Sequence, residues 1–176
     1  MRGRTVLART LAALALVTSA GLGLDAPIGL EAGLGPRMAA AQDSSAIAIV
    51  TNSRTAVSDI SFLELRKIFL GEMQFWGDNS RIVLLVRAPV ARERDVVLSK
   101  IYRMGEAEFQ QYWIAKVFRA EVSSKPKIVY SSDMTSELVT ALPGAIGFLP
   151  ADEVGPGMKV LRINGKLPGE TGYPLQ

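Results

Sequence analysis

The 176-residue sequence contains no cysteine and no histidine. Without cysteine, the chain can form no disulfide, zinc–thiolate site or iron–sulfur cluster, and it has no thiol nucleophile. Without histidine, it has no Ser-His-Asp triad and no imidazole metal ligand or proton shuttle. Chemistry in this protein would therefore depend on carboxylates, lysine, arginine, hydroxyls or backbone amides.

The first 41 residues have the layout of a secretory signal peptide. Three arginines lie within the first nine residues, residues 10–24 form an uncharged apolar run, and residues 39–41 form an A-x-A site. This order of a basic, an apolar and a small-residue segment predicts cleavage before Gln42. An earlier cut after Ala20 is the alternative position. We expect a signal peptide over 1–41 and a single domain over 42–176, located in the periplasm or otherwise exported.

An uncleaved membrane anchor is the other interpretation of the apolar run. A helix needs about 20 apolar residues to span a bilayer. Here Gly21, Gly23 and Asp25 interrupt the run, and the chain has no cysteine that could carry a lipid. The sequence therefore favours a cleaved signal and a soluble exported product.

The basic character of the chain belongs mostly to this leader. The full sequence has a net charge of +3 and a pI of about 9.3. The first 41 residues hold four of the 20 bases and two of the 17 acids, which leaves 16 bases, 15 acids and a net charge of +1. A nearly neutral domain gives little support for binding nucleic acid, and we expect no nucleic-acid partner.

Short apolar runs alternate with amphipathic stretches along residues 42–176. The predicted strands are 46–51, 82–86, 127–130, 145–149 and 158–163, and the predicted helices are 61–70, 91–103, 106–118 and 132–142. This order predicts an α/β domain with helices covering a sheet. In such folds ligands usually bind at the carboxyl ends of strands.

Two helix starts carry capping residues. Ser61 with Glu64 three positions later has the spacing of a capping box, and Ser132 is the expected cap of the fourth helix. The apolar stripes expected in the third and fourth helices are Phe109, Trp113, Val117 and Met134, Leu138, Leu142. We expect these stripes to face the core.

Two strand–helix connections are candidate anion sites. Arg87 and the backbone amides of residues 87–93 could bind an oxyanion, since a helix N-terminus carries about half a positive charge. An ordinary connection with a solvated arginine explains the same residues. Similarly, the hydroxyls of Ser131 and Ser132 could face a ligand, although helix capping alone accounts for Ser132.

The aromatic residues suggest a core more than a stacking surface. Phe109, Tyr112 and Trp113 are spaced i, i+3, i+4 on an apolar helix, which is typical of core packing. The pair Phe75-Trp76 lies beside a turn and fits either a surface aromatic or a lid over the core.

An enzymatic interpretation depends on a single weak motif. Ser124 and Lys127 match the S-x-x-K pattern of a serine nucleophile with its lysine. That chemistry places both residues on one helix, whereas Pro126 and the predicted strand argue against a helix here. We expect a protein that is not an enzyme, with no cofactor and no metal site.

Several segments resemble the phosphate-binding periplasmic component of ABC transporters. They are Ser61–Gly71 with Trp76, Ile82–Arg87, the Pro143–Phe148 segment PGAIGF, and the Gly172–Leu175 segment GYPL. The resemblance covers about residues 46–176. It implies the fold of a type II periplasmic binding protein, with a mixed sheet flanked by helices.

Two departures from this family bear on function. The chain has room for one lobe, whereas full-length members bind the ligand between two lobes. The family's anion loop runs Arg-Ser-Asp-Gly-Ser-Gly-Thr, and the matching stretch here begins at Arg87 and has Ala91 and Glu93 at the hydroxyl positions. The resemblance therefore carries over only Arg87 as a ligand, with Arg92 as a compensating cation.

The sequence leads to two hypotheses of function. The first is an exported, non-catalytic solute-binding module that binds a small oxyanion such as phosphate weakly, through Arg87, Arg92, Ser131 and Ser132. The alternative is an interaction module without a ligand that docks on a membrane transporter or another envelope protein, or that forms a homo-oligomer in place of the missing lobe.

Overall fold

The computed structural model describes residues 46–176, so the predicted signal peptide lies outside the described residues. No helix in the described range is long and apolar enough to cross a membrane. The elements are β1 Ile47–Asn52, β2 Asp59–Ile60, α1 Phe62–Phe69, β3 Val83–Arg87, α2 Arg92–Val97, η1 Leu98–Tyr102, α3 Glu106–Phe118, β4 Lys127–Val129, α4 Ser132–Ala141, β5 Ala145–Pro150, η2 Ala151–Glu153, β6 Met158–Val160 and β7 Arg162–Ile163.

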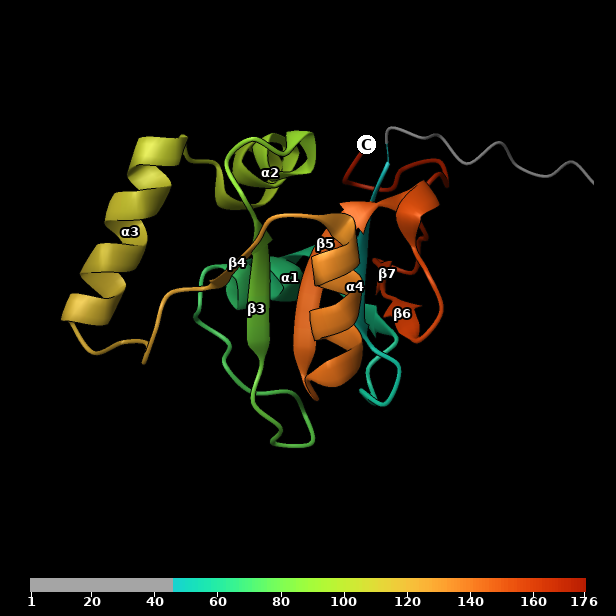
Figure 1. Cartoon of the computed structure of the whole chain (residues 1–176), viewed down its shortest axis with the longest axis horizontal. Helices are drawn as coiled ribbons and strands as arrows, with labels where there is room; N and C mark the ends of the chain where they lie inside the picture. The colour runs from blue at the N-terminus through green and yellow to red at the C-terminus, as the bar shows by residue number, and fades with distance from the viewer. Residues whose placement is uncertain (1–45) are drawn as a thin grey trace, which may run out of the picture. The chain divides into compact units, whose positions relative to one another are not determined.

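A five-stranded mixed sheet in the order β4-β3-β5-β1-β6 organises the domain (Figure 1). Strand β3 is parallel to β4 and β5, whereas β1 is antiparallel to β5 and β6. Strands β2 and β7 form a separate parallel pair. The single strand predicted over 158–163 is therefore two short strands, because the chain leaves the large sheet after Val160 and pairs with β2 from Arg162. The predicted α/β class with a mixed sheet is confirmed.

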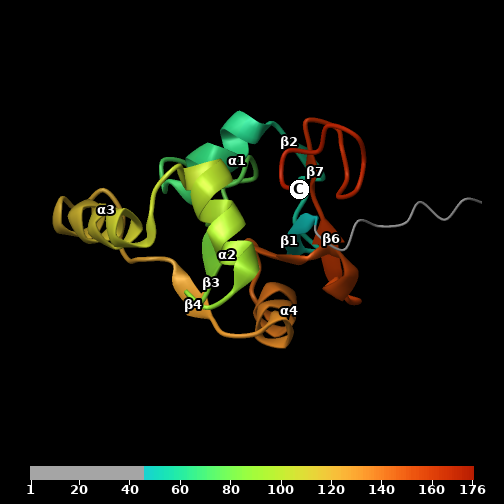
Figure 2. The ribbon, with the colours of Figure 1, turned by 90° about the horizontal axis from the view of Figure 1, so that it is seen from above.

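Helices cover both faces of the sheet, as Figure 2 shows from above. Helices α1 and α2 lie on one side, α4 lies on the other, and α3 lies beside the edge formed by β4. Each covered face has its own cluster of buried apolar residues. This layering explains why all six residues of β1 are buried. The first four are apolar, as is usual for strands covered on both faces, whereas the side chains of Thr51 and Asn52 donate to the Ala145 and Val139 carbonyls.

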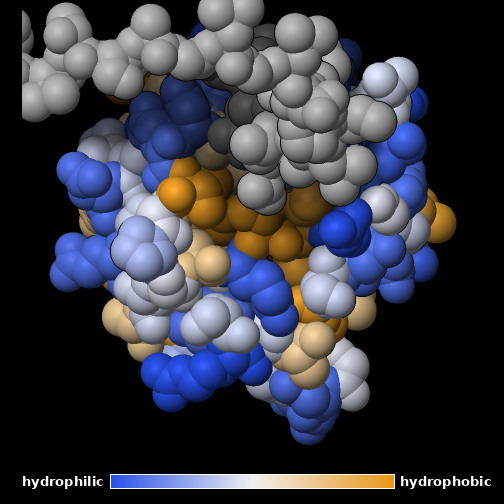
Figure 3. Space-filling view, turned by 90° about the vertical axis from the view of Figure 1, so that its right-hand side faces the viewer, coloured by the Kyte–Doolittle hydropathy of each residue, from blue (hydrophilic) through white to orange (hydrophobic). Residues whose placement is uncertain are grey.

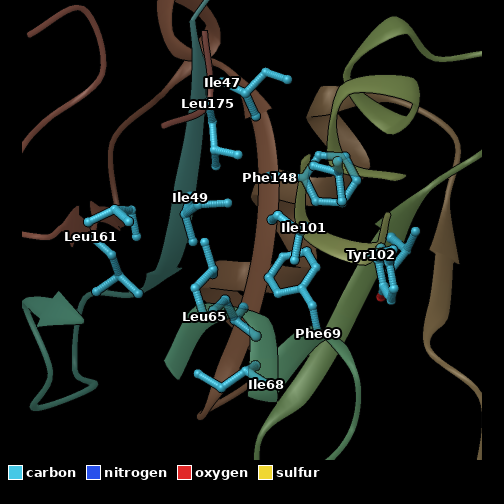
Figure 4. Packing of buried hydrophobic residues seen from close by; sticks show 14 of the residues in the cluster. Ile47, Ile49, Leu65, Ile68, Phe69, Ile101, Tyr102, Phe148, Leu161 and Leu175 are labelled. Atoms are coloured by element: carbon cyan, nitrogen blue, oxygen red, sulfur yellow. The ribbon is translucent and has the colours of Figure 1, made fainter. Parts of the chain in front are cut away.

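The alternation of side chains in β1 divides the two clusters. Ile47 and Ile49 belong to the larger cluster with α1 and η1, whereas Ala48 and Val50 belong to the smaller cluster with α4. Successive strand residues point to opposite faces, so a strand can contribute to both. The residues that meet in the larger cluster include Ile49, Leu65, Ile68, Phe69, Ile101, Tyr102 and Phe148 (Figure 4).

Helix α1 begins with the predicted capping box. The Ser61 hydroxyl oxygen accepts from the Glu64 N–H at 3.1 Å, and the Glu64 carboxylate accepts from the Ser61 N–H at 2.8 Å. These two bonds satisfy backbone donors that the first helical turn leaves free. They fix the start of the helix, whose buried residues are Leu65, Ile68 and Phe69.

The predicted helix over 91–103 is two elements. Helix α2 ends at Val97 and continues into the π-helical turn η1, after which Arg103 has a left-handed φ of 57°. The Met104 N–H donates to the Leu98 carbonyl at 3.2 Å and closes the turn. The wider turn re-aims the chain before α3, and Ile101 still packs in the core.

Helix α3 has the predicted bounds, but only part of its expected stripe is buried. Phe109 and Trp113 are buried and Tyr112 is half-buried, with its hydroxyl donating to the Leu70 carbonyl at 2.7 Å. The core interpretation of these aromatics is confirmed. Val117 is partly exposed and Phe118 is 90% exposed, because the last turn of α3 lies beside the edge of the sheet instead of over its face.

Helix α4 differs from its prediction in cap and in buried face. Its N-cap is Ser131, not Ser132. The fully buried positions are Thr135 and Val139, whereas the predicted stripe of Met134, Leu138 and Leu142 is half-buried. A threonine is tolerated against the sheet because its hydroxyl donates to the Ser131 carbonyl at 3.0 Å.

The PGAIGF segment holds its place through Gly144 and Trp76. The Trp76 indole N–H donates to the Gly144 carbonyl at 3.1 Å. Gly144 has φ +75°, and a Cβ there would overlap the Arg81 carbonyl oxygen. Trp76 is therefore a core residue, whereas its neighbour Phe75 is 49% exposed.

The C-terminal segment returns to the start of β1. The buried Tyr173 hydroxyl donates to the Ile47 carbonyl at 2.7 Å, and the Ile47 N–H donates to the Leu175 carbonyl at 2.9 Å. Leu175 lies beside Ile47 in the core (Figure 4). The face that carries β6 and this segment shows hydrophobic side chains among charged ones (Figure 3).

Candidate functional site

The two segments predicted to bind an anion, which begin at Arg87 and Ser131, lie at the same end of the parallel strands β3 and β4. Strands β3 and β4 are parallel, with Arg87 in register with Val129, and the Ala88 N–H donates to the Val129 carbonyl at 2.8 Å. The carboxyl ends of both strands therefore lie together, so Arg87 and Ser131 lie at the same end of this strand pair. We call Arg87, Arg92, Glu93, Ser131 and Ser132 the strand-end site.

Arg87 is held by a carboxylate of its own chain. Its Nε lies 2.9 Å from Oε1 of Glu93, and the side chains of both residues are 10% exposed. Within the described residues, the Nη1 atom of Arg87 is buried and has no hydrogen-bond partner. Glu93 therefore neutralises the charge of Arg87, the residue predicted to bind an anion, while the two N–H donors of Nη1 have no acceptor among the described residues.

The sequence analysis did not single out Arg94, the most deeply buried charge of this region. Its side chain is 0% exposed, and it forms two hydrogen bonds to the Glu106 carboxylate, at 2.8 and 2.9 Å. It also donates to the Arg87 carbonyl, and its guanidinium lies 4.7 Å from the centre of the Phe109 ring. These contacts fix the carbonyl at the end of β3 and thus the position of Arg87.

The partner of Arg94 carries the electrostatic signature of this contact. The hydrogen bonds from Arg94 lower the pKa of Glu106, assisted by a bond from the Gln110 side chain at 2.8 Å. Glu106 remains ionised in the folded protein at neutral pH and compensates the buried charge of Arg94. Arg94 is therefore committed to structure and is not free to bind a ligand.

The other predicted site residues are more exposed. Arg92 is exposed in the first turn of α2, and Ser132 is half-buried. The Ser131 hydroxyl oxygen accepts from the Met134 N–H at 3.0 Å and so caps α4. This bond uses a lone pair, so the hydroxyl hydrogen of Ser131 can still be donated to an anion.

The serine–lysine motif lacks the arrangement that its chemistry requires. Ser124 lies in the loop after α3, and Lys127 is the first residue of β4. The two residues are thus not one turn apart on a helix, which is the geometry expected of a serine nucleophile and its base. Among residues 46–176 there is also no group of three carboxylates that could hold a metal ion.

No protein-family model matches the sequence, and no match is found among curated proteins. Solved structures do match. An ABC-type phosphate transport receptor from Vibrio cholerae has a TM-score of 0.57 and 20% identity, and the match covers 70% of this chain and 48% of the receptor. A phosphate ABC transporter substrate-binding protein from Clostridium perfringens, solved with bound phosphate, has a TM-score of 0.57, 20% identity and coverages of 70% and 46%.

PstS from Borrelia burgdorferi gives the same result, with a TM-score of 0.55, 17% identity and coverages of 70% and 49%. The chain spans about half the length of each of these proteins. At such low identity the similarity concerns the fold. The described residues thus have an α/β fold that matches one part, roughly half, of the phosphate ABC transporter substrate-binding proteins.

Proposed function

We propose that this protein is an exported, non-catalytic binding module that binds a small oxyanion such as phosphate weakly at the strand-end site. The observation that carries the proposal is the Nη1 atom of Arg87, which is buried and has no partner among residues 46–176. Arg87 lies at the carboxyl ends of β3 and β4, which Ser131 also follows. A buried donor without an acceptor costs about 1–3 kcal/mol. An anion oxygen that accepts from this donor would remove that cost.

Weak binding follows from Glu93. An oxyanion at Arg87 must share the guanidinium with a carboxylate that is already 2.9 Å from its Nε. The net charge of the pair is zero, so the attraction that a free arginine offers is largely cancelled. Exposed Arg92 supplies the remaining positive charge, at a position where solvent screens it.

Calorimetry with phosphate and sulfate tests this function. We expect millimolar binding by the wild-type protein. Glu93→Gln should bind about tenfold more tightly, because a hydrogen bond to a charged group contributes about 1.5–3 kcal/mol once the competing carboxylate is gone. Arg87→Gln should bind neither anion, and Glu137→Gln, which removes an exposed carboxylate of α4, is the matched control.

The proposal fails if neither the wild-type protein nor Glu93→Gln gives heat with phosphate or sulfate and no small anion raises the melting temperature. Circular dichroism must show first that Glu93→Gln is folded. A folded Glu93→Gln that does not bind removes the role of Arg87 as an anion ligand.

An interaction module is the second candidate function. Val90 is 94% exposed in the loop after β3, and Tyr130 is 75% exposed in the loop after β4. Both apolar residues flank the strand-end site, and the chain spans about half of its structural relatives. Sedimentation of the wild-type protein beside Val90→Ser/Tyr130→Ser tests it. A dimer that the double variant dissociates supports self-association through this edge, and a monomer that no envelope protein captures argues against an adaptor.

Export is part of the proposal and has its own test. The predicted cleavage before Gln42 should give an envelope-fraction protein whose N-terminal residue is Gln42 by Edman sequencing or mass spectrometry. Recovery of the uncleaved chain in the membrane fraction would instead support an anchor.

A further inference from the structure

A pocket of about 240 Å³ lies at the opposite end of strands β3 and β4 from the strand-end site. Its wall includes Val83 and Leu84 at the start of β3 and Lys127 at the start of β4. Since β3 and β4 are parallel, their first residues lie together at the amino ends of the strands, and Arg87 and Ser131 lie at the carboxyl ends. Trp113 of α3 and the loop that follows α3 complete the wall, and we call this cavity the Trp113 pocket.

Part of the lining of the Trp113 pocket is apolar. The apolar lining residues include Ile68, Met73, Ile82, Leu84, Trp113 and Val122. Gly71, with φ +68°, also lines it, and a Cβ at this position would lie 2.9 Å from Cη2 of the Trp113 ring. The absence of a side chain at Gly71 therefore lets the chain after α1 pack closely against the Trp113 ring, which is 3% exposed.

The polar part of the wall carries charge of one sign. Arg81, Lys125 and Lys127 line the pocket, and the described residues that line it include no aspartate or glutamate. The nearest acid along this loop, Glu121, is engaged by Lys116 at 3.1 Å and by Arg119 at 2.7 Å. None of the three lining bases forms an ion pair with a described residue.

Neutral hydrogen-bonding groups lie among these bases. Ser123 and Ser124 contribute hydroxyls, and Ser123 accepts a hydrogen bond from Arg81. Gln74 donates its amide to the Glu121 carbonyl at 2.9 Å, which ties the loop after α1 to the loop after α3. The lining of the pocket thus combines aromatic and aliphatic side chains with hydrogen-bond donors that carry a net positive charge.

We propose that the Trp113 pocket binds a small organic monocarboxylate whose body is aromatic or branched aliphatic. The apolar body would be stabilised by burial against the apolar lining residues, at about 25 cal/mol per Å² of apolar surface. The carboxylate would accept charge-assisted hydrogen bonds from the basic residues at the wall. Inorganic phosphate satisfies only the second requirement, so this pocket and the strand-end site select different ligands.

The volume sets the size of the ligand. A pocket of 240 Å³ lies just below the range of about 300–1,000 Å³ that is typical of sites for drug-sized molecules. A molecule of the size of benzoate fits this limit, whereas a long fatty acid exceeds it.

The proposal is tested by titrating the ¹⁵N-labelled protein with sodium benzoate and following the amide resonances of Gly71, Ser123 and Ser124. We expect saturable shifts with a sub-millimolar dissociation constant. Benzyl alcohol, which has a similar body and no charge, should bind about tenfold more weakly because it lacks charge-assisted hydrogen bonds. Inorganic phosphate should leave these resonances unchanged.

Two double variants locate the charge requirement. Lys125→Gln/Lys127→Gln should weaken the affinity for benzoate about fivefold or more, because it removes two bases that line the pocket. Both side chains are exposed, so the change leaves the core intact. Lys100→Gln/Lys166→Gln removes the same net charge away from the pocket and should leave affinity unchanged. Absence of saturable shifts, equal binding of benzyl alcohol, or equal weakening by the two variants would each overturn the proposal.

Discussion

Replacement of Glu106 by glutamine should destabilise the fold through the buried Arg94. The guanidinium of Arg94 is 0% exposed and depends on Glu106 for its compensating charge. Glutamine has nearly the same shape and can accept one hydrogen bond through its oxygen, but its amide group would point a donor at a second guanidinium donor. The substitution therefore changes charge and hydrogen bonding with little change in packing.

The magnitude follows from the exposure of the two partners. Removing one member of a fully buried ion pair costs about 3–5 kcal/mol. The Glu106 side chain is 41% exposed, so water screens part of the interaction, and glutamine retains one bond. We therefore expect a loss of about 2 kcal/mol in the free energy of unfolding at neutral pH.

The pH dependence provides a second measurement of the same contact. Because Arg94 lowers the pKa of Glu106 from its ordinary value of 4.5, the stabilisation is fully present above about pH 4.5. It is lost as the pH falls through the lower pKa of the folded state. The difference between wild type and Glu106→Gln should therefore shrink as the solution is acidified.

Urea unfolding at a series of pH values measures both effects, provided that the m-value is unchanged. Glu137→Gln removes an exposed carboxylate of α4 that pairs with no described residue, and its change should stay within about 0.5 kcal/mol. A loss below about 0.5 kcal/mol for Glu106→Gln at pH 7, or a difference that does not depend on pH, would refute the reasoning about Arg94.

Two further substitutions test the ends of the sheet. Gly144→Ala should cost more than about 1 kcal/mol, because it forces an alanine to φ +75° against the Arg81 carbonyl; a melting temperature equal to that of wild type would contradict this. Tyr173→Phe removes the hydroxyl that donates to the buried Ile47 carbonyl at 2.7 Å and should cost about 1–3 kcal/mol in urea unfolding. An unchanged midpoint would mean that water replaces the lost donor.

Periodicity and capping signals were sufficient to predict most of the fold. The alternation of strands and helices, the capping box at Ser61 and the bounds of α3 are all properties of short stretches of sequence. The errors occur where tertiary contacts determine which face of a helix is buried. Thr135 occupies the buried face of α4 because its hydroxyl bonds back to the helix, and hydrophobicity alone points to its neighbours instead.

The site was less predictable than the fold. The position of Arg87 at the end of a predicted strand marks it as a candidate ligand. Its ion pair with Glu93, six residues later, crosses a strand–helix turn, and neither helical nor strand periodicity predicts a contact at that spacing. The sequence also offers Arg92 and Arg94 as equivalent cations beside it. Which of the two is buried depends on the residue at which α2 begins. Ala91 precedes the helix and forms no side-chain cap, so the sequence carries no capping signal that marks this start.

The position of β1 fixes the order in which this chain can fold. It is the first strand of the described residues, yet its partners are β5 and β6 near the other end, and the bond from Tyr173 to Ile47 spans 126 residues. Contacts of such long sequence separation form slowly, because the intervening loop must close first. Strand β1 therefore has neither edge paired until β5 and β6 have been brought back to it, and the five-stranded sheet is complete only then.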